Sequence, residues 1–272
     1  MLIDLHTHST FSDGRYTPTQ LVAMAAAADI KLLAITDHDS VNGLEEAMNA
    51  AKSVPNAPQI VKGVEMGSQA GEYSVHILGY NIDIHNQNLL AKIEEMRHAR
   101  ETRLHRMLDK IAALGYHITV EDCDPKNRAV GRPHVAKALV AAGYFQSVDE
   151  AFEVLLKRGR PGYEPQPKLS PEEAVRLLHE AGGIAVLAHP AEIENLQLVN
   201  MLLTNINFDG IEVYHPSADE KMQQYFAQLA QEKQLYISGG SDFHGVEGRF
   251  PEQLGVFKVE SSQTSIIQTM IK

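Results

Sequence analysis

Eight short runs of apolar and β-branched residues recur along the chain and predict buried β-strands. They lie at residues 2–5, 32–36, 59–65, 73–79, 184–188, 210–214, 235–238 and 255–259. Nearly continuous apolar runs are typical of parallel strands that are covered on both faces. Because stretches with helical starts separate many of these runs, the pattern predicts an α/β fold.

Polar residues beside the apolar runs predict where helices begin. Thr17, Pro18 and Gln20 form a capping box with proline at the first helical position, and residues 170–173 repeat this arrangement. Ser147 starts a further helix by the same logic. Capped helices are therefore expected in both halves of the chain.

The runs at 59–65 and 73–79 interrupt the alternation of strands and helices. Only a short glycine-containing loop separates them, so they predict an antiparallel hairpin. A regular eight-fold β/α barrel contains only parallel strands. The pattern therefore predicts either an irregular β/α barrel or an open α/β sheet.

The region from about residue 86 to 168 is predicted to be helical, and only the run at 116–120 has some character of a strand. It ends in R-G-R-P-G-Y-E-P-Q-P-K, a connector at 158–168 that is rich in proline and glycine. We predict a helical insertion, residues 97–165, in a catalytic domain formed by residues 1–96 and 166–272.

Composition and charge narrow the class of protein. The chain has 272 residues, of which 44% are hydrophobic and 22% charged, as expected for a globular protein with a sizeable core. Its net charge of −11 argues against a protein that coats a DNA duplex. Between Lys126 and Lys168, however, eight residues are basic and four acidic. A polyanionic substrate would be held by this basic region or by metal ions.

Three further features bear on the cellular compartment. The single cysteine, Cys123, excludes an internal disulfide. Asp4 and His6 lie where a signal sequence would need basic and then apolar residues. The alanine-rich stretch 21–30 is too short to span a membrane. We therefore expect a cytoplasmic protein with no membrane segment and no obligate protein partner.

Histidines and carboxylates gather near the ends of the predicted strands, which is where β/α folds build active sites, and only His76 is expected within a strand. In chain order they are His6, His8, Asp13, Asp37, His38, Asp39, Glu65, His76, His189, Asp242 and His244. We interpret the other singled-out histidines as structural or solvated: His85, His98, His105, His117, His179 and His215.

This set of side chains predicts a site for several metal ions. His6 and His8 are two residues apart, so they share a face of an extended strand and can bind one ion together. Histidine and carboxylate ligands suit Zn, Mn or Fe, and the absence of cysteine argues against a thiolate-rich structural zinc site. One ion cannot use all these ligands, and Glu65 is the natural bridging carboxylate. Two ions about 3.5–4 Å apart are typical of phosphate ester hydrolysis.

The motifs that carry these residues resemble those of the PHP (polymerase and histidinol phosphatase) superfamily of metal-dependent phosphoesterases. They are D-L-H-T-H-S-T-F-S-D-G, A-I-T-D-H-D, G-V-E-M, V-H-I-L-G-Y, V-L-A-H-P and G-G-S-D-F-H-G, and they run in family order over nearly the whole chain. Within the superfamily, the chain is most similar to the branch that hydrolyses nucleoside 3′,5′-bisphosphates and the 5′ ends of short RNA.

The resemblance implies a distorted (β/α)7 TIM-like barrel, the PHP fold, that holds two or three divalent ions, most often Mn²⁺, with Zn²⁺ or Fe²⁺ as alternatives. By position, His6, His8, Glu65 and Asp242 would hold one ion. Glu65, His76 and His189 would hold a second, and Asp13, His38 and His244 a third. Asp13, His38, Glu65 and His189 are also assigned catalytic roles by the resemblance.

Asp13 is a departure from the histidinol phosphatases, which commonly have histidine at this position. The substitution replaces a nitrogen ligand by oxygen, which favours manganese over zinc.

Two basic loops of the insertion, G-R-P-H at 131–134 and K-R-G-R-P-G at 157–162, are candidates for binding a second phosphate of the substrate. Arginine suits this role because its planar guanidinium can bind phosphate in a bidentate manner. The candidate residues are Arg132, His134, Arg158 and Arg160. Alternatively, these side chains cap helices or lie in solvent.

These observations favour a metal-dependent phosphoesterase in which a metal-bound hydroxide attacks a nucleoside 3′,5′-bisphosphate or the 5′ end of a short RNA. The residue that protonates the leaving oxygen is not assigned, and His189 and a metal-bound water are the options. A histidinol-phosphate-type phosphatase is the first alternative, and the basic insertion argues against it. An amidohydrolase or deaminase also begins with His-x-His, but Glu65 stands here in place of a modified lysine. A non-catalytic accessory module is the last alternative, and the complete ligand set argues against it.

Overall fold

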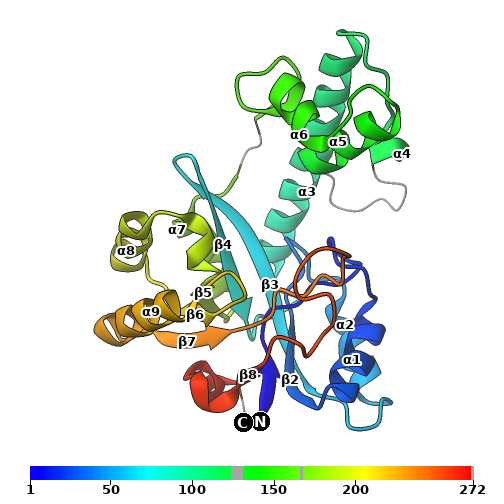
Figure 1. Ribbon diagram of the computed structural model, residues 1–272. Helices are drawn as coiled ribbons and strands as arrows, with labels where there is room; N and C mark the ends of the chain where they lie inside the picture. The colour runs from blue at the N-terminus through cyan, green and yellow to red at the C-terminus, as the bar shows by residue number, and fades with distance from the viewer. Residues whose placement is uncertain (124–130, 166–167, 271–272) are drawn as a thin grey trace. The chain divides into compact units, whose positions relative to one another are not determined.

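The computed structural model describes residues 1–123, 131–165 and 168–270. The chain forms two compact units (Figure 1). The first contains Met1–Ala91 and Lys168–Lys272, and the second contains Lys92–Pro167. The second unit is a few residues longer than the insertion predicted from the sequence.

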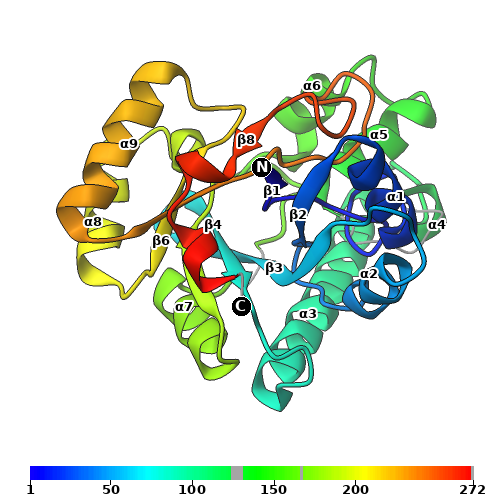
Figure 2. The ribbon, with the colours of Figure 1, turned by 90° about the horizontal axis from the view of Figure 1, so that it is seen from below.

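The first unit contains an eight-stranded sheet in the order β7-β6-β5-β4-β3-β2-β1-β8 (Figures 1 and 2). The strands are β1 (Leu2–Asp4), β2 (Ile30–Ile35), β3 (Gln59–Ala70), β4 (Tyr73–Tyr80), β5 (Ile184–Leu187), β6 (Gly210–Tyr214), β7 (Tyr236–Gly239) and β8 (Val259–Glu260). The sheet curves into a nearly closed barrel, which confirms the predicted α/β fold class.

The predicted hairpin is present and makes the barrel irregular. β3 and β4 are antiparallel, with Gly67 opposite His76, and β4 is also antiparallel to β5. The pairs β1–β2, β2–β3, β5–β6 and β6–β7 are parallel. Gly71 has a φ of 60°, which the tight turn between β3 and β4 requires and glycine adopts without strain.

The chain continues past β1 and β7, and these two extensions pair with each other. Thr7 and Phe243 form a parallel bridge, and the His8 N–H donates to the Phe243 carbonyl over 2.9 Å. This pairing brings the segment of His6 and His8 beside the segment of Asp242. The first and last polar motifs of the sequence therefore meet where the barrel closes.

The prediction of a strand at 255–259 was largely wrong. Only Val259 lies in a strand, the two-residue β8, which pairs antiparallel with β1. Val256 is 54% exposed and Gly255 has a φ of 86°, so this run does not form a buried strand. The weak strand signal at 116–120 was also wrong, because Val120 begins a short helix and the preceding residues are irregular.

Helices cover the sheet of the first unit. They are α1 (Pro18–Ala27), α2 (Leu44–Ala51), α7 (Pro171–Glu180), α8 (Leu196–Asn205) and α9 (Glu220–Lys233), with the 3₁₀ turns η2 (Pro190–Ile193), η3 (Ser261–Gln263) and η4 (Ile266–Thr269). Both predicted capping boxes are confirmed, because the side chains of Thr17 and Ser170 accept from the N–H groups of Gln20 and Glu173. The barrel interior is apolar, with Leu5, Leu32 and Val186 fully or almost fully buried.

The second unit is helical, as predicted. Its elements are most of α3 (Gln87–Ala112), α4 (Val120–Cys123), α5 (Arg132–Ala141), α6 (Val148–Ala151) and the π-helical turn η1 (Phe152–Leu156). Ser147 caps α6 by accepting from the Glu150 N–H. Ile111, Val135, Leu139 and Leu155 belong to a separate apolar core. Residues 166 and 167 of the predicted connector lie outside the described residues.

Within the described part of the chain, no helix combines the length and the hydropathy that crossing a lipid bilayer requires.

Candidate metal centre

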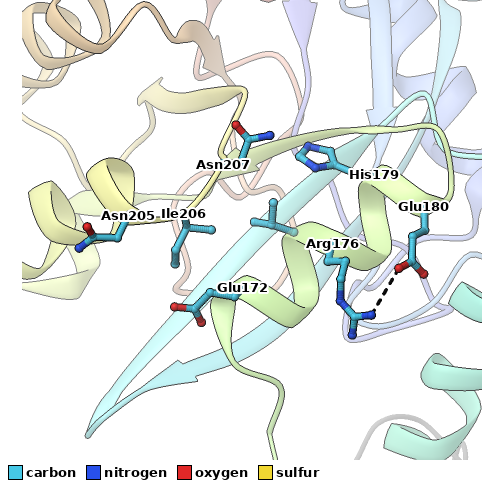
Figure 3. A pocket seen from close by; sticks show the side chains of 8 residues that line it. Glu172, Arg176, His179, Glu180, Asn205, Ile206 and Asn207 are labelled. Atoms are coloured by element: carbon cyan, nitrogen blue, oxygen red, sulfur yellow. Dashed lines mark hydrogen bonds and ion pairs between the residues drawn. The ribbon is translucent and has the colours of Figure 1, made fainter.

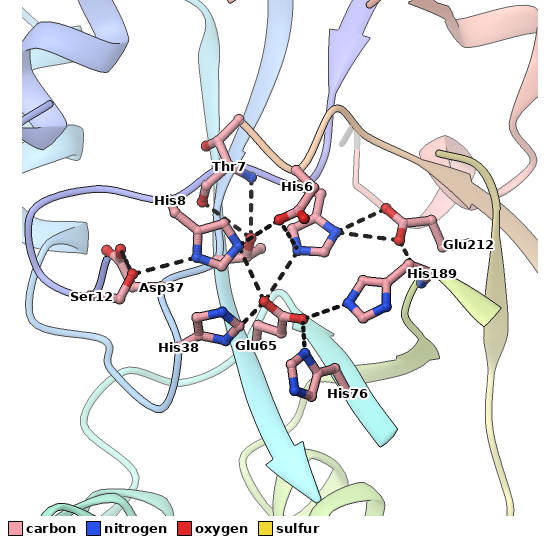
Figure 4. Close-up of polar contacts among 12 residues, drawn as sticks. His6, Thr7, His8, Ser12, Asp37, His38, Glu65, His76, His189 and Glu212 are labelled. Carbon is pink, nitrogen blue, oxygen red and sulfur yellow. Dashed lines mark hydrogen bonds and ion pairs between the residues drawn. The ribbon is translucent and has the colours of Figure 1, made fainter. Parts of the chain in front are cut away.

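The buried carboxylate of Glu65 lies at the centre of the polar cluster (Figure 4). Its two oxygens face different histidines. Oε2 lies 3.3 Å from His6 Nε2, 3.1 Å from His8 Nε2 and 3.0 Å from His38 Nδ1, and Oε1 lies 2.7 Å from His76 Nδ1 and 3.0 Å from His189 Nε2. These side chains come from the ends of β1, β2 and β5 and from β4. A carboxylate with a different ligand group at each oxygen is suited to bridge two ions.

The ligand atoms fall into overlapping groups that could each hold an ion. The main groups are His6, His8, Glu65 and Asp242; His8, Asp13, His38 and His244; and His38, Glu65 and His76, with the ligand atoms of each group within 4.8 Å of one another. The first group has the same members as the first predicted set. The second contains the predicted set of Asp13, His38 and His244, and adds His8.

The remaining predicted set, Glu65, His76 and His189, does not form a group by itself. His189 nevertheless contacts the same oxygen of Glu65 as His76, and the centroids of the two rings are 5.2 Å apart. All nine predicted ligands thus lie in one cluster, and their assignment to individual ions stays a prediction.

Several buried polar atoms of the cluster have no hydrogen-bond partner. Among the described residues these include His8 Nε2, Asp13 Oδ1 and His244 Nε2. His8 Nε2 lies 3.1 Å from both Glu65 and Asp242, yet it is aligned for a hydrogen bond with neither. Buried polar atoms are costly unless something satisfies them. Nitrogen and oxygen donors that converge in this way fit divalent metal ions.

Opposite charges shift the pKa values in the cluster. Burial alone would lower the pKa of His8, but the carboxylates of Asp242 and Glu65, each 3.1 Å from Nε2, raise it to about 10. Burial would raise the pKa of Glu65, but the neighbouring histidines hold it well below its usual range. Burial lowers the pKa of His38 to about 3, against the attraction of Glu65. Without metal, the cluster therefore contains ionised carboxylates beside histidines, some of which are protonated.

Metal uptake at pH 7 is expected to release at least one proton, because a histidine binds metal only when it is deprotonated. His8, with a pKa of about 10 in the metal-free protein, is protonated at this pH and must lose its proton. The affinity for Mn²⁺ should therefore rise with pH, by about tenfold per pH unit for each proton released. Calorimetric titration in two buffers of different ionisation enthalpy measures the proton number. Equal affinities at pH 6 and pH 8 would contradict this assignment.

Glu212 on β6 orients His6 and was not identified from the sequence. Its fully buried carboxylate accepts from His6 Nδ1 over 3.0 Å and from the His189 N–H over 2.8 Å. The first bond directs His6 Nε2 toward Glu65. A carboxylate behind a ligating histidine commonly fixes its orientation and increases its basicity. The signal was a charged residue inside the apolar run G-I-E-V-Y.

Two more buried carboxylates fix the loops that carry the ligands. Asp37 accepts from the hydroxyls of Ser9 and Ser12, and Asp4 accepts from the Ser241 N–H and hydroxyl. Burial raises the pKa of Asp4 to about 6, although the bonds from Ser241 oppose this shift. Asp37 was seen in the sequence as part of the polar cluster, but the structure gives it no place in the ligand groups.

Two candidate ligands have unusual backbone conformations. His189 has a φ of 24° and Asp242 a φ of 51°. Non-glycine residues adopt positive φ at a cost, and such strain is often found at functional sites. Gly240 lies close by, and a Cβ at this position would lie 2.4 Å from the backbone nitrogen of His6. Only glycine therefore allows the chain to pass so close to His6.

The four predicted phosphate-binding residues all belong to the second unit. Arg132 Nη1 donates to the Leu156 carbonyl over 3.4 Å, and its guanidinium lies over the rings of Phe152 and Tyr163. His134 Nδ1 accepts from the Gly131 N–H at the start of α5. Arg158 and Arg160 are exposed. These positions are consistent with both sequence-based interpretations, and a phosphate-binding role stays a prediction.

A shallow surface pocket of about 470 Å³ lies elsewhere on the first unit, along α7 and the segment 205–207 (Figure 3). Its lining includes Arg176, His179 and Asn207. None of the ligands described above lines it, so we do not connect it with the metal centre.

A cluster of histidines and carboxylates at the strand ends of a β/α barrel defines a metal-dependent hydrolase. Residues 4–252 match the model of the PHP domain. The chain belongs to the PHP domain family.

Known relatives narrow the class further. Over 252 residues the chain is 36% identical to a 3′,5′-nucleoside bisphosphate phosphatase of Chromobacterium violaceum, a match that covers 89% of this chain and 87% of the relative. Over 253 residues it is 32% identical to a 5′-3′ exoribonuclease of Escherichia coli, with 90% and 85% covered. A solved structure from Bifidobacterium adolescentis, described as a metal-dependent phosphoesterase, has a TM-score of 0.79 at 30% identity, with 96% and 93% covered. The chain is thus a metal-dependent phosphoesterase.

Proposed function

We propose that this chain hydrolyses phosphate esters of nucleotides, and that nucleoside 3′,5′-bisphosphates and the 5′ ends of short RNA are its substrates. The carboxylate of Glu65, contacted by five histidines, is the observation that carries the hydrolytic part of this proposal. The names of the relatives and the basic residues of the helical unit support the nucleotide part.

Each group of side chains has a task in this reaction. Bound divalent ions would supply a nucleophile at neutral pH and neutralise charge that develops on the phosphate. Glu65 would hold the ions with its two oxygens, and Asp13, His38 and His189 would supply further ligand atoms around it. Glu212 holds the proton on His6 Nδ1 and so keeps Nε2 available for metal.

We further propose that the ions are manganese, two or three in number, and that the protein works in the cytoplasm. Asp13 adds an oxygen ligand where the histidinol phosphatases commonly have nitrogen, which favours Mn²⁺ over Zn²⁺. The single cysteine excludes an intrachain disulfide and suits a reducing compartment. Metal analysis of the purified protein, with anomalous scattering from crystals, tests the identity and number of the ions.

The proposed function is tested by substrate comparison. Purified protein with Mn²⁺ should release phosphate from adenosine 3′,5′-bisphosphate, and mononucleotides from a short 5′-phosphorylated RNA, much faster than phosphate from histidinol phosphate. Equal rates on the bisphosphate and on histidinol phosphate would refute the substrate proposal and favour a histidinol-phosphate-type enzyme. Hydrolysis of none of these esters would favour a non-catalytic metal-binding module.

Arg132→Gln is expected to impair hydrolysis of the bisphosphate selectively. A hydrogen bond between arginine and phosphate contributes about 1.5–3 kcal/mol, so kcat/KM for this substrate should fall about 10- to 100-fold. The value for 4-nitrophenyl phosphate, which has no second phosphate, should change by less than about twofold. Arg97→Gln is the matched control, because Arg97 lies exposed on α3 and pairs with Glu94. Equal losses on both substrates would remove Arg132 from substrate recognition.

A further inference from the structure

The two oxygens of Asp242 have different neighbours. Oδ1 lies 3.1 Å from His8 Nε2 and 3.4 Å from His6 Nε2, on the side of the metal ligands. Oδ2 lies 2.6 Å from Arg249 Nη2 and 3.7 Å from His215 Nε2. One oxygen therefore faces candidate metal ligands, and the other faces two side chains that carry hydrogen-bond donors.

The hydrogen bonds of His215 determine which of its ring nitrogens can donate. Nδ1 lies 2.7 Å from the hydroxyl of Ser217, which can donate or accept, and 3.1 Å from the backbone nitrogen of Ser217. The backbone N–H can only donate, so Nδ1 acts as an acceptor and the hydroxyl donates to it as well. The ring hydrogen is then on Nε2. Nε2 is buried without a hydrogen-bond partner, and His215 is only 3% exposed.

This tautomer excludes His215 from the ligands of a metal ion. Its position beside His6 and Glu212, and in a second group with Glu192 and Asp242, would otherwise allow such a role. A protonated Nε2 has no lone pair for a metal ion. Our interpretation of His215 as merely structural was therefore incomplete, because its buried Nε2–H lies 3.7 Å from Asp242 Oδ2 and forms no hydrogen bond.

Arg249 brings a second donor to the same place. It lies in the segment after β7, and its side chain is 46% exposed although Nη2 contacts the nearly buried Asp242. A guanidinium has five N–H donors in a planar fork, so a bond to Asp242 leaves donors for an anion. Lysine could not offer the same arrangement, because its ammonium is a compact point charge.

We propose that Arg249 and His215 form an anion subsite beside Asp242 that binds the oxygens of the phosphate group undergoing hydrolysis. This inference rests on the proposed function, because it gives the phosphate of that reaction its position. The subsite would orient the phosphate and add one positive charge and one neutral donor to the charge supplied by bound ions. Inorganic phosphate, the product, has the same oxygens and should bind to the same donors.

Phosphate affinity of the manganese-loaded protein tests the subsite without turnover. By calorimetry, Arg249→Gln should bind inorganic phosphate about 10- to 100-fold more weakly, the usual range for losing a charge-assisted hydrogen bond. His215→Ala should weaken binding about tenfold, and His215→Gln should restore most of it, because an amide nitrogen can replace Nε2–H. Manganese stoichiometry should match the wild type in all three. Arg176→Gln, a surface arginine on α7 that pairs with Glu180, is the matched control.

Two results would overturn the inference. Unchanged phosphate affinity in Arg249→Gln would remove Arg249 from the subsite. If Arg249→Gln lost manganese binding and phosphate binding to the same extent, Arg249 would be only a counter-ion of Asp242. Failure of the proposed function gives a different result: the wild type would hydrolyse none of the esters, yet still bind phosphate more tightly than Arg249→Gln.

Discussion

Replacing Glu65 with glutamine is expected to remove metal ions from the protein and to lower kcat/KM by at least about 1,000-fold. Glutamine keeps the size of the side chain but removes its charge and one of its two acceptor oxygens. The structure places both oxygens among histidine ligands, so neither is dispensable. Loss of about 4 kcal/mol of metal-dependent transition-state stabilisation corresponds to this factor. Metal analysis and steady-state kinetics measure the two effects on the same sample.

Glu172→Gln is the matched control for this substitution, because Glu172 is an exposed residue in the first turn of α7. It should keep the metal content and the activity of the wild type. Full metal content in Glu65→Gln would show that Glu65 does not bridge ions. Full activity after metal loss would contradict metal-dependent hydrolysis itself.

Most of the fold was predictable because its strands are short, apolar and separated by capped helices. The hairpin of β3 and β4 was recognisable because too few residues separate the two runs for a crossover helix. The prediction of a strand at 255–259 was wrong because it rested on residue type alone. G-V-F-K-V consists largely of strand-forming residues, but whether such a run is buried depends on contacts with residues far away in the sequence. Val256 is exposed, and only Val259 reaches β1.

The clustering of the candidate metal ligands was predictable for a different reason. Most of them follow apolar runs, and the ends of parallel strands meet at one edge of a barrel, so the convergence of these residues follows from the fold class. Glu65 and His76 lie inside the antiparallel strands β3 and β4. The supporting carboxylates could not be identified in this way. Glu212 lies inside a strand, and its partner His6 is 206 positions away in the sequence. Only the order and register of β1 and β6 in the barrel bring them together.

The structure also separates histidines that are equivalent in the sequence. His189 and His215 both follow a parallel strand, and both precede proline. His189 directs Nε2 to Glu65, whereas the Ser217 N–H occupies Nδ1 of His215 and leaves a donor at Nε2. The distinction between a metal ligand and a hydrogen-bond donor depends on these local bonds, which no residue pattern shows.

His8→Ala is also expected to cause a large loss of metal ions and of activity, because His8 belongs to two of the ligand groups. It lies with His6, Glu65 and Asp242 in one group, and with Asp13, His38 and His244 in another. Losing it should weaken both, lower kcat/KM by at least about 1,000-fold and reduce the number of bound ions by more than one. His244→Ala removes a member of one group only, so it is the informative comparison and should cost at most one ion.

The same pair of variants tests whether the ligand groups act independently. His8 is completely buried, so the melting temperature of each metal-free variant must be measured beside its metal content. Folded His8→Ala protein with low metal content and negligible turnover would support the overlapping groups. If His8→Ala and His244→Ala lose the same number of ions, His8 serves one group only and the shared-ligand arrangement is wrong. If His8→Ala keeps its activity, His8 has no essential place in the metal centre.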